Sequence, residues 1–238
     1  MIVEFIGCTG AGKTTLISQI RPKLARAARV HTAHELVAGR LGLGALANPT
    51  ASNLVEEVAA LPYFLASLPR HRAYFGFAVR LFARDTRLSL TTINNLRSLE
   101  RKIGGHEIAR RHDPNAIVLV DEGPIQAAHM FAFNATPPGP AEIARFAVLV
   151  PLPDLVVYVR SSVDALVKRT LTRSGAPRQI RGRSSTSTEV YIRRAVAVFD
   201  RLVQAERLDR AFRTVSGGGD AGVRATHKPP HHSWMAAD

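Results

Sequence analysis

The hydrophobic positions of this chain form two patterns that alternate along its length. Short, nearly continuous apolar runs are typical of strands buried on both faces of a sheet. They occupy residues 2–6, 117–120 and 155–159, with weaker examples at 30–32 and 213–215. Apolar residues that recur every three or four positions indicate helices. These segments cover 16–24, 54–68, 70–99, 163–171 and 189–208. The alternation predicts an α/β domain with a doubly wound, parallel five-stranded sheet and helices on both faces.

Proline and glycine interrupt the helical pattern in its longest stretch. Pro62 and Pro69 divide the region before residue 70, and a proline inside a helix removes a backbone hydrogen bond. Gly104 and Gly105 interrupt the pattern further along. We therefore expect the helices to be broken at these points.

The segment between the first strand and the first helix has the spacing G-x-x-x-x-G-K-[ST] of a phosphate-binding loop, or P-loop. Its glycines allow the backbone to bend tightly and bring N–H groups to a phosphate. Lys13 adds a positive charge, and the helix that starts near it directs its positive dipole end to the same place. We expect a nucleoside triphosphate to be bound by Gly7, Cys8, Thr9, Gly10, Ala11, Gly12, Lys13, Thr14 and Thr15.

Two oxygen-bearing side chains are candidates for holding Mg²⁺ beside this loop. The Thr14 hydroxyl is a hard ligand of the kind that Mg²⁺ prefers. Asp121 follows the apolar run at 117–120, and the carboxyl ends of parallel strands meet at one edge of the sheet. The sequence therefore predicts a magnesium site at Thr14 and Asp121, with Asp121 acting directly or through water. The alternative for Asp121 is a helix cap or turn.

Two glutamates are candidates for a general base. Glu35 follows the weak second strand, and a carboxylate there would lie near an acceptor, across from the γ-phosphate. Glu122 follows Asp121 and is a second candidate for the base or for assisting the metal. Either carboxylate has a plain alternative, since Glu35 could lie on a helix surface and Glu122 could point into solvent.

Arginines are concentrated around a polar stretch at residues 174–187. A basic loop that closes over a triphosphate would exclude water and neutralise transition-state charge. We therefore predict an arginine-rich lid at about 173–188, although a solvated loop would have the same composition. The residues assigned to it or to its approach are Arg169, Arg173, Arg178, Arg181 and Arg183.

The remaining organisation follows from these elements. Residues 1–215 form a single domain in which helices between about 36 and 112 provide the acceptor side. Residues 216–238 are rich in Gly, Pro and His and are expected to be a flexible tail. Several arginines are available on the acceptor side to hold an anionic acceptor. They are Arg70, Arg72, Arg80, Arg84 and Arg97.

Composition narrows the class of protein. An apolar content of 46% suits a globular protein, and no apolar run approaches the roughly 20 residues that span a bilayer. The first strand begins at residue 2 and leaves no room for a signal peptide. Cys8 is the only cysteine, so no internal disulfide can form. We expect a cytoplasmic protein without a membrane partner.

The net charge of +13 permits two interpretations. One is a basic surface together with arginines that bind nucleotide and a phosphorylated substrate. The other is a nucleic-acid partner. We favour the first because the arginines are spread from Arg21 to Arg224 and form no single block.

The chain resembles the P-loop kinase family that contains thymidylate kinase and the deoxynucleoside kinases. The resemblance covers about half of the chain and implies a P-loop NTPase fold, ATP as donor, and in many members a homodimer. It also places Arg169 and Arg173 at lid-arginine positions. Four segments carry it, and they are FIGCTGAGKTTL, IVLVDEG, PDLVVYVRSSVDALVKRTLTRSG and YIRRAVAVFDRL.

Two departures from that family concern the substrate. Family members usually carry an arginine where this chain has Glu122, and the segment after the second strand lacks their acceptor-binding signatures. A divergent member acting on another acceptor is therefore expected, such as a sugar, a natural-product hydroxyl or a modified nucleoside.

The leading hypothesis is a kinase that uses ATP and Mg²⁺ to phosphorylate a small-molecule acceptor. Lys13 would neutralise the phosphates, and Glu35 or Glu122 would be the base for a hydroxyl acceptor. A phosphate acceptor would need arginines in place of a strong base. A kinase or ATPase acting on nucleic acid is the second hypothesis, and a regulatory P-loop NTPase is the third. The preference for ATP over GTP, and the identity of the acceptor, stay open.

Overall fold

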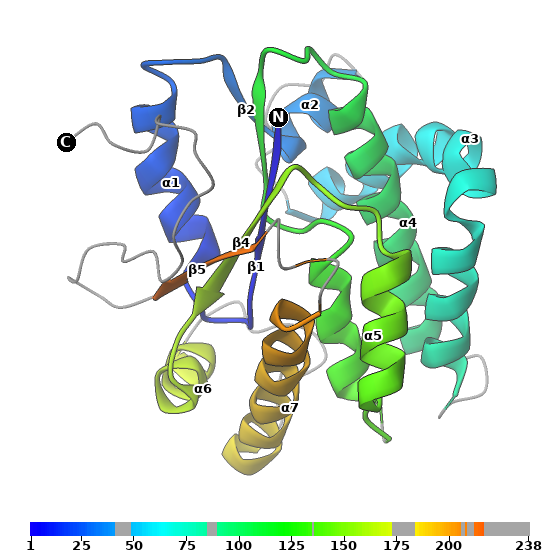
Figure 1. The fold of residues 1–238 in the computed structure, drawn as a ribbon, viewed down its shortest axis with the longest axis vertical. Helices are drawn as coiled ribbons and strands as arrows, with labels where there is room; N and C mark the ends of the chain where they lie inside the picture. Colours follow the sequence, from blue (N-terminus) through cyan, green and yellow to red (C-terminus); the bar gives the residue numbers. More distant parts are fainter. Residues whose placement is uncertain are drawn as a thin grey trace.

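The computed structural model describes residues 1–40, 49–84, 90–134, 136–172, 184–205, 208 and 212–216. Its centre is a sheet of five parallel strands in the order β2-β3-β1-β4-β5 (Figure 1). The predicted parallel five-stranded sheet is therefore confirmed. The strands are β1 (Ile2–Ile6), β2 (Val30–Thr32), β3 (Ile117–Val120), β4 (Leu155–Arg160) and β5 (Phe212–Ser216).

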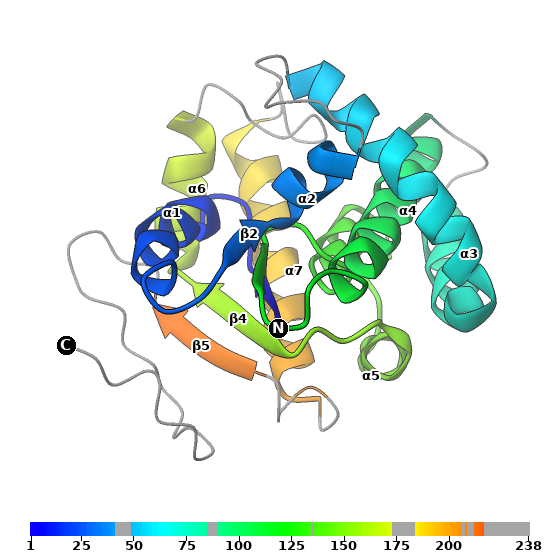
Figure 2. The ribbon, with the colours of Figure 1, turned by 90° about the horizontal axis from the view of Figure 1, so that it is seen from above.

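Helices cover both faces of this sheet, as the alternating pattern predicts. In Figure 2, α1 and α6 lie on one side of the strands and α3, α4 and α5 on the other. The helices are α1 (Lys13–Leu24), α2 (Ala33–Arg40), α3 (Pro49–Ala83), α4 (Leu90–Arg110), α5 (Pro140–Leu149), α6 (Val163–Thr172) and α7 (Ser185–Val203). A 3₁₀ helix, η1 (Gln126–Phe133), follows β3.

Successive residues of β1 face opposite layers, which explains why the strand is apolar almost throughout. Val3 and Phe5 pack into the cluster that includes α1 and α6. Ile6 packs into the larger cluster formed with α3, α4, α5 and α7. Glu4 lies on the same face of the strand as Ile6 and is fully buried. A carboxyl group in the central strand is the exception to this pattern.

The larger cluster is built around aromatic side chains. The ring of Phe146 lies 5.5 Å from that of Tyr74 and 5.3 Å from that of Phe131, both at steep angles that favour edge-to-face contact. The apolar stripe of α3 that includes Tyr74, Ala78 and Leu81 is buried there. That stripe therefore contributes to core packing.

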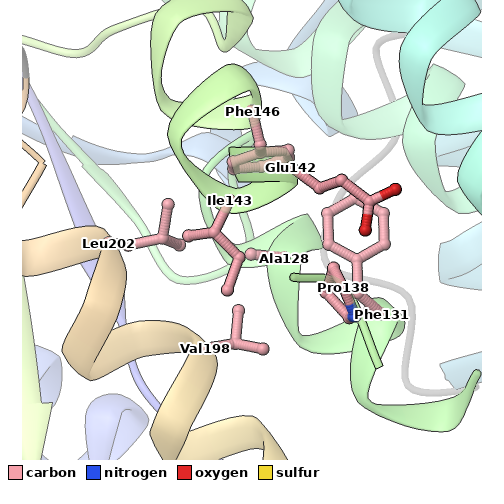
Figure 3. A pocket seen from close by; sticks show the side chains of 8 residues that line it. All are labelled: Ala128, Phe131, Pro138, Glu142, Ile143, Phe146, Val198 and Leu202. Carbon is pink, nitrogen blue, oxygen red and sulfur yellow. The ribbon is translucent and has the colours of Figure 1, made fainter. Parts of the chain in front are cut away.

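A narrow crevice with no room for a water molecule, partly open to solvent, lies between η1, α5 and α7 (Figure 3). Its walls are apolar apart from Glu142, whose carboxylate accepts hydrogen bonds from Arg84 and from the backbone N–H of Gly139. The space has no polar group left to orient a ligand, so we interpret it as loose packing.

The expected helix breaks at proline and glycine are wrong. Pro62 and Pro69 lie inside α3, and the helix changes direction along its length instead of ending (Figure 1). Gly104 and Gly105 lie inside α4. At Gly104 an added Cβ would lie 2.3 Å from the Ala60 carbonyl oxygen of α3. Glycine is present here because α3 and α4 approach closely.

Two predicted boundaries also change. The lid was expected to extend to about residue 188, but α7 begins at Ser185 and is capped by the Ser184 hydroxyl, which accepts from the Ser187 N–H. Ser216, assigned to the tail, ends β5. The rest of the tail, 217–238, and most of the lid, 173–183, lie outside the described residues.

Among the described residues, no helix combines the length and the apolar character needed to cross a membrane.

The adjacent glycines of α4 provide a matched test of helix packing. Gly104→Ala should lower the urea midpoint, at a cost of about 1–3 kcal/mol, because its Cβ would overlap the Ala60 backbone. Gly105→Ala should keep or raise stability, since nothing lies within 4 Å of its Cβ position and alanine favours the helix by about 1 kcal/mol. Equal losses in the two variants would contradict this packing.

Candidate functional site

The loop after β1 has the backbone geometry of a phosphate cradle. Gly7, Gly10 and Gly12 all have positive φ angles, of 146°, 78° and 95°. A Cβ on Gly7 would lie 2.5 Å from the Val159 carbonyl oxygen of β4, so a side chain is excluded there. The first turn of α1 has neither a side-chain cap nor an acidic residue. Its free N–H groups suit an anion.

The other loop residues contribute backbone more than side chain. Cys8 and Ala11 are buried, and the Ala11 N–H donates to the Cys8 carbonyl at 3.1 Å in a tight turn. Burial raises the pKa of the Cys8 thiol to about 12. Thr9 is half-buried, and Thr15 is exposed in the first turn of α1. The predicted binding residues of this segment therefore form one continuous loop.

Lys13 lies folded over the loop. Its Nζ donates to the Gly7 carbonyl at 3.0 Å and to the Cys8 carbonyl at 3.4 Å. Burial lowers the pKa of Lys13, and the nearby carboxylates of Asp121 and Glu122 partly offset this effect. The lysine is therefore held by two backbone carbonyls of the loop that it follows.

Thr14 and Asp121 meet as the sequence predicts. The Thr14 hydroxyl donates to Oδ2 of Asp121 at 2.7 Å. The other oxygen of that carboxylate, Oδ1, is buried and has no hydrogen-bond partner in the described part of the chain. Hydroxyl and carboxylate oxygens suit Mg²⁺, and an unpartnered buried oxygen is a place where a cation or its bound water would fit. These residues thus fit a magnesium ion.

Glu122 lies beside this pair and forms an ion pair with Lys102 of α4. Lys102 Nζ lies 2.8 Å from Glu122 Oε2; its own side chain is 1% exposed, whereas that of Glu122 is 62% exposed. The ammonium group of Lys102 lowers the pKa of Glu122 despite the cost of desolvation. His129 lies close by, and burial lowers its pKa to about 4, so this histidine is neutral at pH 7.

Glu35 has a structural role that sequence analysis did not identify. The Glu35 N–H donates to the Thr32 hydroxyl at 3.2 Å, and the Thr32 N–H donates to the Glu35 carboxylate at 3.0 Å. These reciprocal bonds form a capping box at the start of α2. Arg21 also binds this carboxylate at 2.8 Å. Glu35 is therefore bound to the end of β2 and to α1, whereas Glu122 acts electrostatically on Lys13.

Arg169 reaches the phosphate loop from α6. Its guanidinium donates to the Gly10 carbonyl at 3.3 Å and lies 3.4 Å from the Ser161 hydroxyl. Arg173 and Arg178, the other predicted lid arginines, lie outside the described residues. The role of all three in binding triphosphate stays a prediction.

Sequence analysis missed two buried residues that support the phosphate loop through hydrogen bonds. Gln126 makes two hydrogen bonds with Gly7, and Glu4 accepts from the Gln126 N–H. Glu4 had a usable signal, because it is the one charged residue in an apolar strand. Gln126 had none, since glutamine at the start of a helix follows no motif.

The comparisons with known proteins agree with this geometry at the level of the fold. No protein-family model matches the sequence, and no curated protein matches it. A deoxyadenosine kinase from M. mycoides with bound dATP is similar in structure, with a TM-score of 0.51 and 15% identity over 93% of each chain. A second structure of that enzyme, with dCMP and dCDP, has a TM-score of 0.49 and 14% identity over 91% of each chain.

A shikimate kinase from Bacteroides thetaiotaomicron is also similar, with a TM-score of 0.43 and 12% identity over 93% of this chain and 89% of that one. Similarity at such low identity concerns the fold alone. The parallel sheet and its phosphate loop fit an α/β P-loop NTPase fold.

Proposed function

We propose that this chain is a phosphotransferase that moves the γ-phosphoryl group of ATP to a hydroxyl group of a small molecule, with Mg²⁺. The observation that carries the proposal is the contact between the Thr14 hydroxyl and Asp121, next to Lys13 and with the second Asp121 oxygen unpartnered. Positioning and positive charge are most of what phosphoryl transfer requires from a protein. This edge of the sheet supplies both.

Different groups of the loop and its neighbours would bind different parts of the phosphoryl donor. The backbone N–H groups of the loop and the first turn of α1 bind phosphate oxygens. Lys13 leaves the Gly7 carbonyl and neutralises the transferred group. Thr14 and Asp121 hold Mg²⁺, which when bound draws negative charge from the phosphate oxygens. Arg169, already at the Gly10 carbonyl, adds charge from the side of α6.

The position of the carboxylates favours Glu122 as the base. Glu122 follows Asp121 directly and its charge acts on Lys13, and although it pairs with Lys102 its side chain is 62% exposed. Glu35 is engaged in capping α2 and in the ion pair with Arg21. A carboxylate of lowered pKa is a weak base, which suits a loose transition state with little demand for early proton removal.

The charges of α4 support a hydroxyl acceptor over a phosphate acceptor. Each lysine and arginine of this helix lies within 4.0 Å of a glutamate, so most of its positive charge is compensated. Arg84 likewise binds Glu142, whereas Arg70 shares Glu107 with Arg110. The α4 pairs are Arg97 with Glu57, Arg101 with Glu56, Lys102 with Glu122, and Arg110 with Glu107.

Glu100 of α4 adds a carboxyl group that has no ion-pair partner among the described residues. Burial and the neighbouring Glu57 raise its pKa to about 7, and its Oε1 is buried with no hydrogen-bond partner in the described part of the chain. At this pKa the group is only partly ionised at neutral pH, and it adds no cation to which a phosphate acceptor could bind.

ATP is the donor that we propose, because the similar deoxyadenosine kinase has a bound adenine nucleotide. Location in the cytoplasm, assembly into a homodimer and binding to nucleic acid stay predictions from the sequence.

Transfer from γ-labelled ATP tests the proposed function directly. Acceptors would be offered in pairs that differ only by a phosphate, such as nucleosides with their monophosphates and sugars with sugar phosphates, together with aminoglycoside-like alcohols and short oligonucleotides. We expect label on an unphosphorylated hydroxyl compound, and a loss of about 10²-fold or more in Lys13→Ala, which removes the charge on the phosphates. Label recovered as a phosphoanhydride on the phosphorylated members would refute the hydroxyl acceptor, and label on oligonucleotides would favour the nucleic-acid hypothesis.

Matched variants separate the two candidate bases. Glu122→Gln should lower kcat by about 10²-fold, the low end for a general base because this transition state has little demand for early proton removal. The variant also removes the carboxylate that pairs with Lys102, so the Kd for ATP and the Tm are measured beside kcat. Glu35→Gln should retain kcat and lose about 1 kcal/mol of stability through the weakened cap. Loss of kcat in Glu35→Gln alone would transfer the role of base to Glu35.

The magnesium site predicts different results for two changes at Thr14. Thr14→Ser keeps the hydroxyl and should retain the wild-type dependence of activity on Mg²⁺ concentration. Thr14→Ala removes a hard oxygen ligand, and Asp121→Asn removes the negative charge of the carboxylate. Each variant should need about tenfold more Mg²⁺ for half-maximal activity. Titration of Mg²⁺ at saturating ATP measures this; equal curves for Thr14→Ser and Thr14→Ala would count against Thr14 as a ligand.

A further inference from the structure

Gln126 joins the segment after β3 to the phosphate loop by two buried hydrogen bonds. The Gly7 N–H donates to Gln126 Oε1 at 2.9 Å, and Gln126 Nε2 donates to the Gly7 carbonyl at 3.0 Å. The Gln126 residue is 5% exposed. Because Gly7 lies beyond the end of β1, this amide replaces the backbone partner that a neighbouring strand would have provided.

The Gln126 backbone is itself held at both polar atoms. Its N–H donates to Glu4 Oε1 at 2.8 Å, and its carbonyl accepts from His129 Nδ1 at 2.6 Å. Gly123 is needed for the first of these contacts, since a Cβ there would lie 2.4 Å from the Glu4 carboxyl carbon. The side chain of Gln126 is therefore directed at Gly7 by its own fixed backbone.

Burying the Glu4 carboxyl group in the central strand costs free energy. It is fully buried, and its Oε2 has no hydrogen-bond partner within the described residues. Burial raises its pKa to about 8, so the carboxyl group is mostly neutral at pH 7 and acts as a hydrogen-bonding group. A buried polar group that breaks the apolar pattern of its strand calls for a specific role, and the Gln126 N–H is its contact.

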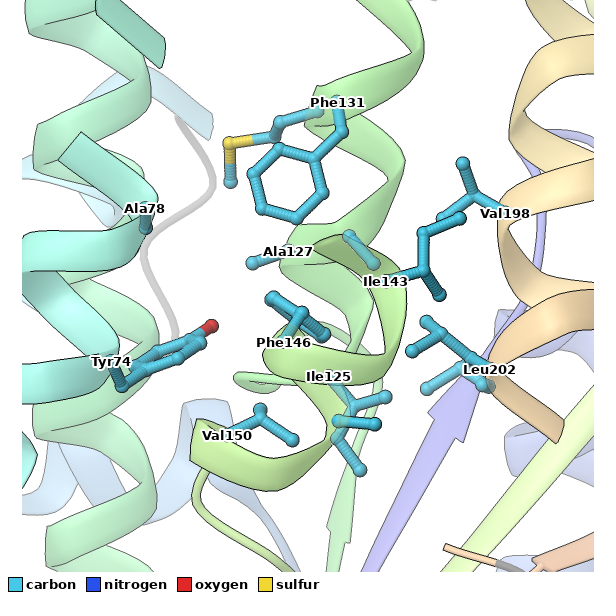
Figure 4. Close-up of a cluster of buried hydrophobic side chains, with 14 of the residues drawn as sticks. Tyr74, Ala78, Ile125, Ala127, Phe131, Ile143, Phe146, Val150, Val198 and Leu202 are labelled. Atoms are coloured by element: carbon cyan, nitrogen blue, oxygen red, sulfur yellow. The ribbon is translucent and has the colours of Figure 1, made fainter. Parts of the chain in front are cut away.

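The turn between Asp121 and Gln126 is also held from the helical layer. The Tyr74 hydroxyl of α3 donates to the Pro124 carbonyl at 2.7 Å. Figure 4 shows Tyr74 and Ile125 on opposite sides of Phe146 within the same apolar cluster. The turn that carries Asp121 and Gln126 is thus anchored at Glu4, at Tyr74 and at Gly7.

We propose that Gln126 is a positioning residue for the phosphate loop and that Glu4 holds Gln126 in place. Neither residue contacts the nucleotide. The proposal rests on the proposed function only for its consequence, which is that nucleotide affinity depends on this pair. The Gly7 carbonyl accepts hydrogen bonds from both Gln126 Nε2 and Lys13 Nζ. By positioning this carbonyl, Gln126 also influences where the Lys13 ammonium group lies before a nucleotide binds.

Cys8 reports on the loop without any ligand. It is the only cysteine of the chain, it follows Gly7 directly, and it is 3% exposed. Alkylation of Cys8 by iodoacetamide therefore requires the loop to open locally. In Gln126→Ala the rate of alkylation, followed by mass spectrometry, should rise by about tenfold or more because two buried hydrogen bonds are lost.

Asn134→Ala is the matched control for that measurement. Asn134 is also a buried amide, and its Nδ2 donates to the Leu81 carbonyl at 2.9 Å, away from the loop. This variant should have a lower Tm and a wild-type rate of alkylation. A wild-type rate in Gln126→Ala, or an equal increase in both variants, would overturn the proposal.

Variants of Glu4 and the affinity for nucleotide complete the test. Glu4→Leu removes the acceptor for the Gln126 N–H and should match Gln126→Ala, whereas Glu4→Gln keeps an acceptor oxygen and should restore the slow rate. Calorimetric titration with MgATP should give a Kd about tenfold higher in Gln126→Ala and unchanged in Asn134→Ala. If the wild-type chain binds no nucleoside triphosphate, the proposed function fails, and the alkylation rates still decide the role of Gln126.

Discussion

The parallel pairing of β1 with β3 and β4 is the constraint on which the candidate site depends. Glu4 pairs in register with Val120 and Val156, so the ends of these strands reach the same edge of the sheet. The phosphate loop leaves β1 at that edge, and Asp121 leaves β3 beside it. Their contact through Thr14 then needs no long side chain and no movement of a helix. The parallel arrangement therefore brings the segments proposed to bind triphosphate and metal to one edge of the sheet.

Charge compensation distinguishes the two sides of this site. The phosphate loop offers N–H groups and Lys13 to an anion, and its helix start has no acidic residue. On the acceptor side, the cations of α4 are matched by glutamates, and Glu100 adds a further carboxyl group. A chain with a formal charge of +13 therefore has no excess of positive charge along this helix. Total charge is a poor guide to the acceptor because recognition depends on the local balance.

Several errors of sequence analysis have one origin, which is that a local signal can be overridden by a distant contact. Pro62 and Pro69 lie within α3 and do not end it. Packing of the helix on α4 and on the core stabilises it despite these prolines. Gly104 signals a break by its own propensity, yet it is required by the close approach of Ala60. Glu35 is a separate case, because the Thr-x-x-Glu capping box that it completes is itself a local pattern, visible in the sequence but not considered.

The sequence by itself determined the class of fold, the phosphate loop and the pairing of Thr14 with Asp121. The fold class and the loop follow from periodicity and from a motif whose residues are close in the chain. The pairing of Thr14 with Asp121 joins residues far apart in the chain, and it could be predicted because the carboxyl ends of parallel strands meet at one edge of the sheet. Only the tertiary structure decided that Glu122 faces Lys13 and Lys102, and that Gln126 and Glu4 hold Gly7. Those contacts join residues about 20 to 120 positions apart, and their formation depends on how whole layers pack, which no local pattern encodes.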